Sequence, residues 1–409
     1  MYQKLSIVKR FSNLIFIVWV ITFCACNNST STKNAVTDNL DTLHFTVEAA
    51  PEWDALFKRQ HGWFGGDGVY SIPLNGKENV YADDSSETLI LFSDTVIGDI
   101  INDSLQEGFS FVRNSVAVLK GKDPIEKNIS FYWAEEKEKP ATMFIPNIAG
   151  IVPSDVYWLG DGFVNISADS SLNLFSFLIR QTKYGLGFAE AGNAMIKINK
   201  KTEPPYTNYR QTQTPFFIKP SVDTGYDYGS YGSGILVNTK AADAPNPDGY
   251  VYVYGMQGKE KNVLVARVLP AEFDQFDRWK FYDGKEWNAD INKSAGITDS
   301  ASNELSVSAL PDGRYAMVFQ VNGISSYVGL RLGKTPYGPF GKVIKIWNCD
   351  DVLKTSKNFM VYNAKAHPSL SKPGELLISY NVNSTDFFND IKIYPDLYRP
   401  RFIKLKMLL

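Results

Sequence analysis

Residues 63–74 of the chain read Trp-Phe-Gly-Gly-Asp-Gly-Val-Tyr-Ser-Ile-Pro-Leu, and residues 87–95 read Glu-Thr-Leu-Ile-Leu-Phe-Ser-Asp-Thr. Each stretch contains a short apolar run, Val69–Leu74 in the first and Thr88–Phe92 in the second. The Asn75–Glu87 segment between them is rich in turn-forming and charged residues. This pattern predicts an antiparallel hairpin of two strands.

An aspartate stands at the outer end of each predicted strand. Asp67 precedes the first strand and Asp94 follows the second. Because the start of one strand and the end of the next meet at the same edge of an antiparallel pair, we expect the two carboxyl groups to lie side by side. The glycines beside Asp67 allow the backbone to turn tightly there. We refer to Asp67 and Asp94 as the acid pair.

The composition is that of a globular protein with a sizeable core, since 44% of the 409 residues are hydrophobic and 21% are charged. A large all-β fold of this length can form a single domain. Aromatic residues make up 14% of the chain. They favour strands, most of them serve core packing, and some line sugar sites. The formal net charge is −2, without a basic stripe, so we expect no nucleic-acid partner.

The N-terminus has the pattern of a targeting segment. Lys4, Lys9 and Arg10 lead into the apolar run Leu14–Phe23, which is short for a membrane span. Cys26 follows the small residue Ala25 and resembles the lipidated cysteine of a bacterial lipoprotein, whereas bulky Phe23 precedes Cys24. We therefore expect a lipoprotein signal over residues 1–25, lipidation of Cys26 and a flexible tether over residues 26–39. An ordinary secretory signal and a single anchor helix are the alternatives.

Residues 40–409 show a repeated unit, namely a polar or small residue, a short strand, a turn and a second apolar strand. The five units begin at Asp67, Asp161, Ser233, Glu304 and His367. Such units, with further strand-like runs and no long amphipathic helix between them, predict an all-β, five-bladed β-propeller in one domain. The uneven spacing suggests loop insertions, notably Lys183–Tyr226. We also expect Phe402–Met407 to pair with the Leu43–Val47 region, because an open ring would leave a bare edge.

The first strands of propeller blades run the same way around the channel, so their starting residues should gather at one mouth. Asp67, Asp94 and Glu304 are the candidate catalytic residues, with Glu304 as a general acid across the channel from the acid pair. The candidate substrate-binding residues are Trp63, Arg113, Asn114, Asp161 and His367.

Each candidate also has a structural interpretation. Asp67 and Asp161 stand in Gly-Asp-Gly turns, where aspartate is common without any further role. Asp94 can cap a turn, and His367 before Pro368 is more often a hydrogen-bonded structural residue.

Carboxylates around a concave, aromatic-lined mouth resemble a glycosidase site. Glycoside hydrolysis needs one carboxylic acid to protonate the leaving oxygen and a second carboxylate to attack or to activate water. Crowding raises the pKa of at least one of them. The three His residues show no metal-ligand spacing, and neither a Gly-x-Ser-x-Gly elbow nor a phosphate loop occurs. We expect no cofactor, and no ligand motif supports a structural calcium ion.

The stretch Gly65–Leu74 with Leu91–Thr95 resembles the opening blade of propeller lipoproteins of the Bacteroides group. It is similar to the endo-D-arabinanases of glycoside hydrolase family 183 and, more distantly, to the five-bladed propellers of family 43. The resemblance covers about thirty residues. It implies catalytic roles for Asp67 and Asp94 only.

We therefore expect a glycoside hydrolase that cleaves a polysaccharide or oligosaccharide, with an arabinan-type furanoside as the favoured substrate. We expect a monomer in the cell envelope that meets the membrane through its lipid anchor only. The alternatives are a glycan-binding or surface-scaffold propeller without turnover and a phosphorylase, which would need basic residues at the mouth.

Overall fold

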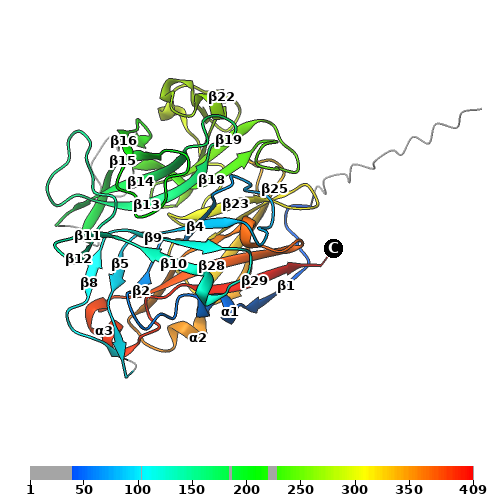
Figure 1. Ribbon diagram of the computed structural model, residues 1–409. Helices are drawn as coiled ribbons and strands as arrows, with labels where there is room; N and C mark the ends of the chain where they lie inside the picture. The colour runs from blue at the N-terminus through cyan, green and yellow to red at the C-terminus, as the bar shows by residue number, and fades with distance from the viewer. Residues whose placement is uncertain (1–38, 103, 184–186, 220–227, 409) are drawn as a thin grey trace, which may run out of the picture. The chain divides into compact units, whose positions relative to one another are not determined.

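The computed structural model describes residues 39–102, 104–183, 187–219 and 228–408. Antiparallel strands form most of the regular structure (Figure 1). The expected signal segment with Cys26, and nearly all of the expected tether, lie outside the described residues. The helices are short and are α1 (Pro51–Ala55), α2 (Asp350–Leu353), α3 (Phe387–Ile393), and the 3-10 turns η1 (Glu126–Asn128), η2 (Pro270–Glu272), η3 (Phe276–Arg278), η4 (Ile291–Lys293) and η5 (Pro368–Leu370). No helix in this part of the chain is long and apolar enough to span a membrane.

Within the described residues, five sheets of four or more strands carry the fold, which confirms the prediction of repeated antiparallel units. In hydrogen-bonded order they consist of β3 (Tyr70–Pro73), β4 (Glu87–Phe92), β9 (Ser115–Lys120) and β10 (Ile129–Tyr132); β13 (Val156–Val164), β14 (Leu172–Gln181), β15 (Phe188–Ile198) and β16 (Arg210–Gln213); β17 (Phe217–Ile218), β18 (Gly229–Asn238), β19 (Tyr250–Gln257), β20 (Asn262–Val268), β21 (Lys280–Tyr282) and β22 (Trp287–Asn288); β23 (Leu305–Ala309), β24 (Tyr315–Gln320), β25 (Tyr327–Gly333) and β26 (Ile344–Asn348); and β27 (Phe359–Ala366), β28 (Glu375–Ser384), β29 (Arg401–Met407) and β1 (Phe45–Ala49).

Three small sheets extend this framework. They consist of β2 (Trp63–Gly66), β5 (Thr95–Ile97) and β8 (Ser110–Val112); β6 (Ile100–Ile101) and β7 (Ser104–Leu105); and β11 (Ala134–Glu136) and β12 (Lys139–Ala141). The first of them matters for function, because β2 leads into β3 and β4 leads into β5. The chain therefore crosses twice from one sheet to the other at the same place.

The predicted hairpin is present with the expected strands. Tyr70 of β3 pairs with Leu91 of β4, and Pro73 pairs with Thr88. Register in a two-sided strand pair is set by which side chains must be buried. The β4 residues from Thr88 onward are buried, so a one-residue slip would misplace the whole core face.

Strands from opposite ends of the described chain share one sheet. β1 pairs along β29, with Phe45 opposite Met407 and Ala49 opposite Ile403. Figure 1 shows β1 in blue beside β29 in red. This confirms the predicted pairing of the two ends.

One strand of each large sheet contacts a strand of the next in chain order, from β3 through β13, β18 and β23 to β27. We call these five strands the first strands of their units. The short helix η5, which follows β27, contacts β3. A dense aromatic cluster joins the first sheet to the sheet that holds the chain ends: Phe57 stacks on Phe402 of β29 and packs edge-on against Phe92 of β4. Burial of each such ring stabilises the fold by about 1.5–3 kcal/mol.

Two expectations about the repeat are wrong. The first strand of the fifth unit is β27, which precedes His367, and the residues after His367 form the helix η5 instead of the short strand that we expected there. Pro368 has no N–H for a strand ladder, whereas it suits the first turn of a helix. The Lys183–Tyr226 segment is not only a loop insertion, because it supplies β15 and β16 of the second sheet.

Three of the five first strands are interrupted at comparable places. β13 shifts register between Leu159 and Gly162, β18 between Tyr231 and Gly234, and β27 between Tyr362 and Lys365. Such β-bulges re-aim side chains and are frequent beside active sites. The prediction that Asp161 and Ser233 start their strands is accordingly wrong, since both lie inside a strand at a bulge.

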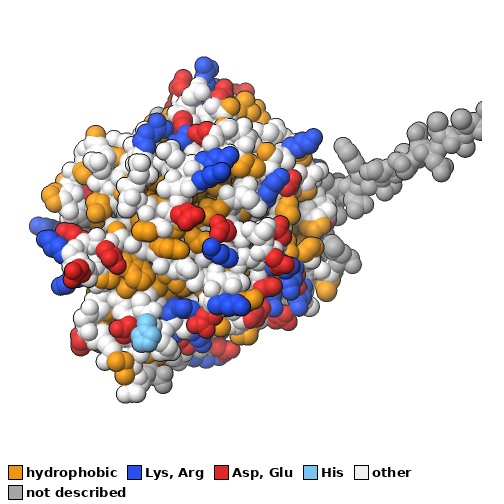
Figure 2. Space-filling model, in the orientation of Figure 1, with side chains coloured by type: hydrophobic (Ala, Val, Ile, Leu, Met, Phe, Trp, Pro, Cys, Tyr) orange, Lys and Arg blue, Asp and Glu red, His pale blue; other side chains and the backbone are white. Residues whose placement is uncertain are grey.

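Charged side chains of both signs are interspersed over the face of the protein that Figure 2 shows. This distribution agrees with the nearly balanced charge of the sequence.

Candidate active site

The acid pair lies where the chain passes between two sheets. Asp67 stands between β2 and β3, and Asp94 stands between β4 and β5. The two backbones bond to each other, with the Asp67 N–H donating to Asp94 O (3.3 Å) and the Ser93 N–H donating to Asp67 O (2.9 Å). Gly68 has a φ of +73°, and a side chain there would meet Ser93 Oγ at 2.9 Å. The glycine next to Asp67 is therefore required by the turn that brings the two aspartates together.

Asp67 is half-buried, with its Oδ1 enclosed by protein, and its carboxyl group keeps a proton near neutral pH. Burial raises its pKa to about 8, and the neighbouring Asp94 carboxylate adds to this shift. The Tyr362 hydroxyl donates a hydrogen bond of 2.7 Å to Asp67 Oδ2, which opposes the rise. Asp67 Oδ1 is buried and has no hydrogen-bond partner among the described residues.

Asp94 differs from Asp67 in its charged partner. Arg113 Nη1 lies 3.3 Å from Asp94 Oδ1 and 3.4 Å from Oδ2. Burial raises the pKa of Asp94, whereas the Arg113 guanidinium and the nearby Trp158 indole lower it. The guanidinium also lies over the Phe111 ring, 5.0 Å from its centre. Arg113 therefore opposes the rise in the pKa of Asp94, favours its ionised form and is itself held in place by an aromatic face.

Glu304, immediately before β23, lies close enough to raise the pKa of Asp67 through its charge. It forms an ion pair with Lys365, whose side chain is only 1% exposed, and Asn363 Nδ2 donates to Glu304 Oε1 at 2.6 Å. Burial raises the pKa of Glu304, and Lys365 opposes this. Both partners come from the β27 bulge, where Asn363 has a φ of +59°.

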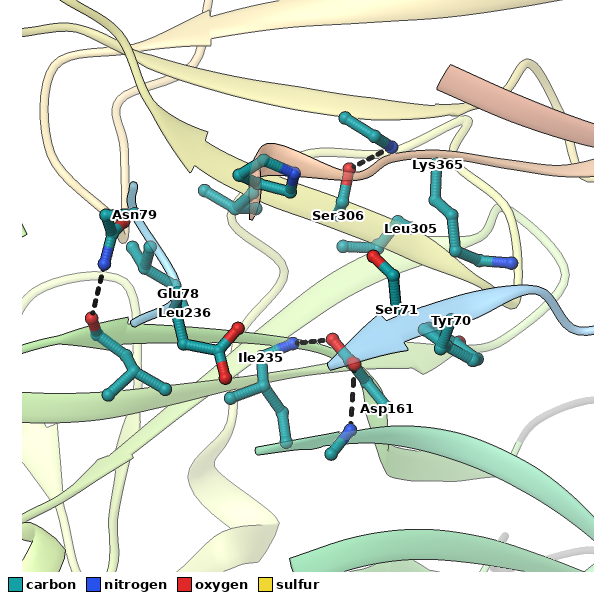
Figure 3. Close-up of a pocket in the computed structure, with 15 residues that line it drawn as sticks. Tyr70, Ser71, Glu78, Asn79, Asp161, Ile235, Leu236, Leu305, Ser306 and Lys365 are labelled. Carbon is teal, nitrogen blue, oxygen red and sulfur yellow. Dashed lines mark hydrogen bonds between the residues drawn. The ribbon is translucent and has the colours of Figure 1, made fainter. Parts of the chain in front are cut away.

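Asp161 lies deeper, at the β13 bulge. It accepts hydrogen bonds from the backbone N–H groups of Gly162 (2.8 Å) and Ile235 (2.7 Å), as Figure 3 shows. Burial raises its pKa to about 7 despite these bonds. Asp161 thus ties β13 to β18 and lies within the electrostatic reach of Glu304.

A cavity of about 40 Å³ lies among the first strands. Asp161, Glu78 and Lys365 line it together with Ser71 and Ser306 (Figure 3). Its volume accommodates water rather than a sugar ring. Burial raises the pKa of Glu78 well above its ordinary value, which favours the neutral form of this side chain. Among the described residues, no group of three or more His, Cys, Asp or Glu side chains is placed to hold a metal ion.

Three of the residues predicted to bind substrate are enclosed by protein. Trp63 is 1% exposed and stacks on Phe131 at 4.7 Å. Asn114 is fully buried, and its amide bonds to the backbone of Phe144 and Tyr157. Both side chains hold strands together and offer no surface to a ligand, so we leave them outside the candidate site.

His367 is the third enclosed residue. Its Nδ1 lies 2.9 Å from Ser71 Oγ, and its Nε2 lies 2.8 Å from Ser379 Oγ. Burial lowers the pKa of His367 to about 3, so the ring is neutral at physiological pH. The histidine links the first sheet to the sheet with the chain ends, and we do not include it in the site.

Sequence reasoning missed several residues that surround the carboxyl groups. They are Glu78, Trp158, Tyr362, Asn363, Lys365 and Tyr398. Polar Asn363 and Lys365 interrupt the otherwise largely apolar sequence of β27, Phe-Met-Val-Tyr-Asn-Ala-Lys-Ala. This interruption is the sequence feature that could have pointed to these two residues. The backbone of Tyr398 passes close to Gly65, two residues before Asp67. A Cβ atom at position 65 would lie 2.3 Å from Tyr398 O, so only glycine permits this approach.

The buried carboxyl groups should make the protein more stable at mildly acidic pH than at alkaline pH. Burial raises the pKa of Asp54 to about 6, of Asp161 to about 7, and of Asp67 and Glu190 to about 8. Between about pH 4 and pH 8 the folded state therefore binds more protons than the unfolded chain, so stability falls as pH rises. His367 acts in the opposite sense below about pH 6.5, but it is one group against four.

We expect the melting temperature to be higher at pH 5 than at pH 8, by on the order of 5 °C. Differential scanning calorimetry of one preparation in buffers of matched ionic strength measures this difference. A melting temperature that rises from pH 5 to pH 8 would show that these carboxyl groups are ionised in the folded protein.

The geometry places two carboxyl groups of different character side by side. Asp67 is neutral near pH 7 and accepts a hydrogen bond from Tyr362, and no ion pair with Asp67 occurs among the described residues. Asp94, by contrast, forms an ion pair with Arg113. A protonated and an ionised carboxyl group in one site can give and accept a proton in the same reaction.

A solved structure from the Bacteroides group is similar to the chain over most of its length. It is a "putative hydrolase" from Bacteroides ovatus ATCC 8483. The two chains share 20% identity and superpose with a TM-score of 0.64 over 91% of this chain and 96% of that one. This likeness shows a shared fold.

Two glycoside hydrolases are weaker matches. The endo-arabinase from Bacteroides thetaiotaomicron VPI-5482 has 12% identity and a TM-score of 0.39, over 84% of this chain and 98% of its own. The GH32 beta-fructofuranosidase from Bombyx mori has 12% identity and a TM-score of 0.39, over 87% of this chain and 62% of its own.

No curated protein matches the chain in sequence. The family model described as "Domain of unknown function (DUF5005)" matches residues 51–407, which include every strand except β1 and every residue of the candidate site. The chain belongs to the DUF5005 family.

Proposed function

We propose that the protein is a glycoside hydrolase. In this proposal Asp67 is the general acid, and Asp94 is the carboxylate that attacks the anomeric carbon or activates water. The observation that carries this proposal is the acid pair itself, a buried carboxyl group that keeps its proton beside a second one held by Arg113. The resemblance of the opening hairpin to arabinan-cleaving propellers makes a furanoside polymer of the arabinan type the first substrate class to test.

The proposal includes a closed five-bladed propeller as the scaffold. Its support is the sequence of contacts from β3 through β13, β18 and β23 to β27, the contact of η5 with β3, and the pairing of β1 with β29. In such a ring the acid pair stands at one mouth of the channel, where a glycan chain can reach it from solvent.

The two carboxyl groups divide the chemistry. Asp67 gives its proton to the glycosidic oxygen as the bond to the anomeric carbon breaks, and the leaving sugar departs as an alcohol. Asp94 supplies the negative charge opposite the oxocarbenium-like transition state, either by attacking the anomeric carbon or by taking a proton from the attacking water. Arg113 orients Asp94 and keeps it ionised, and Glu304 with Lys365 supports the site from the channel side.

The proposed location is the cell envelope, with Cys26 as lipid anchor and with the protein acting as a monomer. The basic start, the short apolar run and the small residue before Cys26 support this location. Globomycin-sensitive processing, or labelling of the protein with an azido fatty acid that is lost in Cys26→Ser, would test the anchor.

The direct test uses soluble protein that begins after Cys26, incubated with arabinans, other furanoside polymers and common plant and bacterial glycans. Appearance of new reducing ends or oligosaccharides with one of them supports the proposal. Binding of a glycan without any release would identify a glycan-binding propeller instead, and would overturn the assignment as an enzyme.

The pH dependence of kcat/KM should report the ionisation of Asp67. Because Asp67 acts as the acid and its pKa lies at about 8, we expect kcat/KM to fall above about pH 8 with a slope of one proton. A matched control is Glu190→Gln, since burial raises the pKa of Glu190 to about 8 as well and its recorded partner is Ser230. The alkaline fall should persist in this variant; its disappearance would assign the titration to Glu190.

A further inference from the structure

Three side chains form a hydrogen-bonded row that ends on the acid pair. Asn383 Nδ2, from β28, donates to Tyr362 Oη at 3.2 Å. Tyr362, from β27, donates in turn to Asp67 Oδ2 at 2.7 Å. Tyr362 is half-buried, and desolvation raises the pKa of its phenol well above the ordinary value, so it keeps its single proton.

The direction of these hydrogen bonds is fixed by the groups at the far end of the row. Asn383 Oδ1 accepts the backbone N–H of Ser384 at 2.7 Å, so the amide nitrogen of Asn383 must face Tyr362. An amide nitrogen only donates hydrogen bonds. The Tyr362 oxygen therefore accepts from Asn383, and the one hydroxyl hydrogen is directed to Asp67 Oδ2.

This direction selects one of the two oxygens of Asp67. The oxygen of a neutral carboxyl group that accepts a strong hydrogen bond is the carbonyl-type oxygen, so the acid proton belongs on the other oxygen. That oxygen is Oδ1, which is buried and has no partner among the described residues. A buried oxygen without a partner is costly, as is expected where the missing partner is a ligand.

We propose that Tyr362 is a positioning residue that, held by Asn383, keeps the transferable proton of Asp67 on Oδ1. This inference rests on the proposed function for its catalytic meaning, whereas the hydrogen bond itself can be tested without any substrate. Tyr362 would not touch the reacting atoms; it would act by fixing the orientation and protonation of the carboxyl group that does.

The backbone conformation around Tyr362 positions its side chain for the hydrogen bond to Asp67. The register of β27 against β28 shifts directly after Tyr362, and the next residue, Asn363, has a φ of +59°. Asn363 is a residue type that tolerates this conformation. The bulge lets one strand direct Tyr362 to Asp67 while Asn363 and Lys365 contact Glu304.

Tyr398 provides a matched comparison. Its hydroxyl also lies beside Asp67, and burial also raises the pKa of its phenol well above the ordinary value. The Tyr398 hydroxyl lowers the pKa of Asp67 less than the Tyr362 hydroxyl does. Both tyrosines can be replaced by phenylalanine with the loss of one oxygen atom each.

The experiment compares Tyr362→Phe with Tyr398→Phe in two measurements. The first is the titration of the Asp67 carboxyl carbon by NMR in protein labelled with ¹³C-aspartate, with the signal assigned from Asp67→Asn. The Tyr362 hydrogen bond favours the ionised form, so its loss should raise the pKa of Asp67 in Tyr362→Phe and change it much less in Tyr398→Phe.

The second measurement is the steady-state kinetics on a cleaved glycan. We expect kcat to fall about 100-fold in Tyr362→Phe with little change in KM, and the alkaline fall of kcat/KM to move to higher pH. Tyr398→Phe should stay within a few-fold of the unmodified enzyme.

The outcomes separate this inference from the proposed function. Equal effects of the two variants, or no shift of the Asp67 titration in Tyr362→Phe, would overturn the role of Tyr362. If no glycan is cleaved but the NMR titration shifts as expected, the hydrogen-bonded row stands and the assignment as a hydrolase fails.

Discussion

Asp67→Asn should reduce glycan cleavage by about 10³-fold while leaving the protein folded. An amide has nearly the same shape as the carboxyl group and still accepts the hydrogen bond from Tyr362, but it has no proton to give to a glycosidic oxygen. Because burial already favours the neutral form of Asp67, the neutral amide should not lower the melting temperature at pH 7.

The measurement is the initial rate of release of reducing ends, with thermal unfolding of the same samples. Asp84→Asn serves as the control, since Asp84 is an exposed carboxylate in the loop of the same hairpin and its recorded ion pair is with Lys122. Retention of more than a tenth of the activity in Asp67→Asn would exclude Asp67 as the acid.

Lys365→Met should destabilise the protein by about 3 kcal/mol, because it leaves the buried carboxylate of Glu304 without its cation. Lys365 is almost fully enclosed, and its ammonium group also lies over the Tyr70 ring, 4.3 Å from the centre. Without Lys365 the pKa of Glu304 should rise further above its ordinary value. A higher pKa in the folded state adds stability at low pH that is lost as the pH rises. The loss of stability caused by Lys365→Met should therefore be larger at pH 8 than at pH 5.

Chemical unfolding at the two pH values measures this loss. The double variant Glu304→Gln with Lys365→Met removes both charges and should recover part of the stability, which gives the coupling energy of the pair. A loss below 1 kcal/mol at pH 8 in the single variant would mean that water or another group compensates Glu304.

The sequence was informative wherever short-range patterns decide the structure. The hairpin of β3 and β4 follows from two apolar runs and a turn-rich segment, and the strands β20, β21, β25 and β26 coincide with apolar runs. The β1–β29 pairing could be predicted because an unpaired edge strand is unfavourable. The bulges of β13, β18 and β27 could not, since each depends on how two strands compete for register rather than on composition.

The candidate site was predicted only in part, for a similar reason. Asp67 and Asp94 could be placed together because hairpin geometry alone brings them to one edge. Trp63 and Asn114 were misplaced because an aromatic ring or an amide that binds sugar has the same local sequence context as one that packs in the core. Tyr362 comes from far along the chain, and no local pattern states that a tyrosine in β27 will reach an aspartate beside β3.

The shared sheet of β1 and β29 has a consequence for the order in which the protein can mature. β28 obtains its partner β29 only after residues 401–407 have been synthesised, and β29 then pairs with β1, a strand made much earlier. Until that moment one side of β28 presents unpaired backbone groups, which other chains can join. A chain that is cut short before Arg401 should therefore be a substrate for proteases and chaperones rather than a slightly destabilised protein.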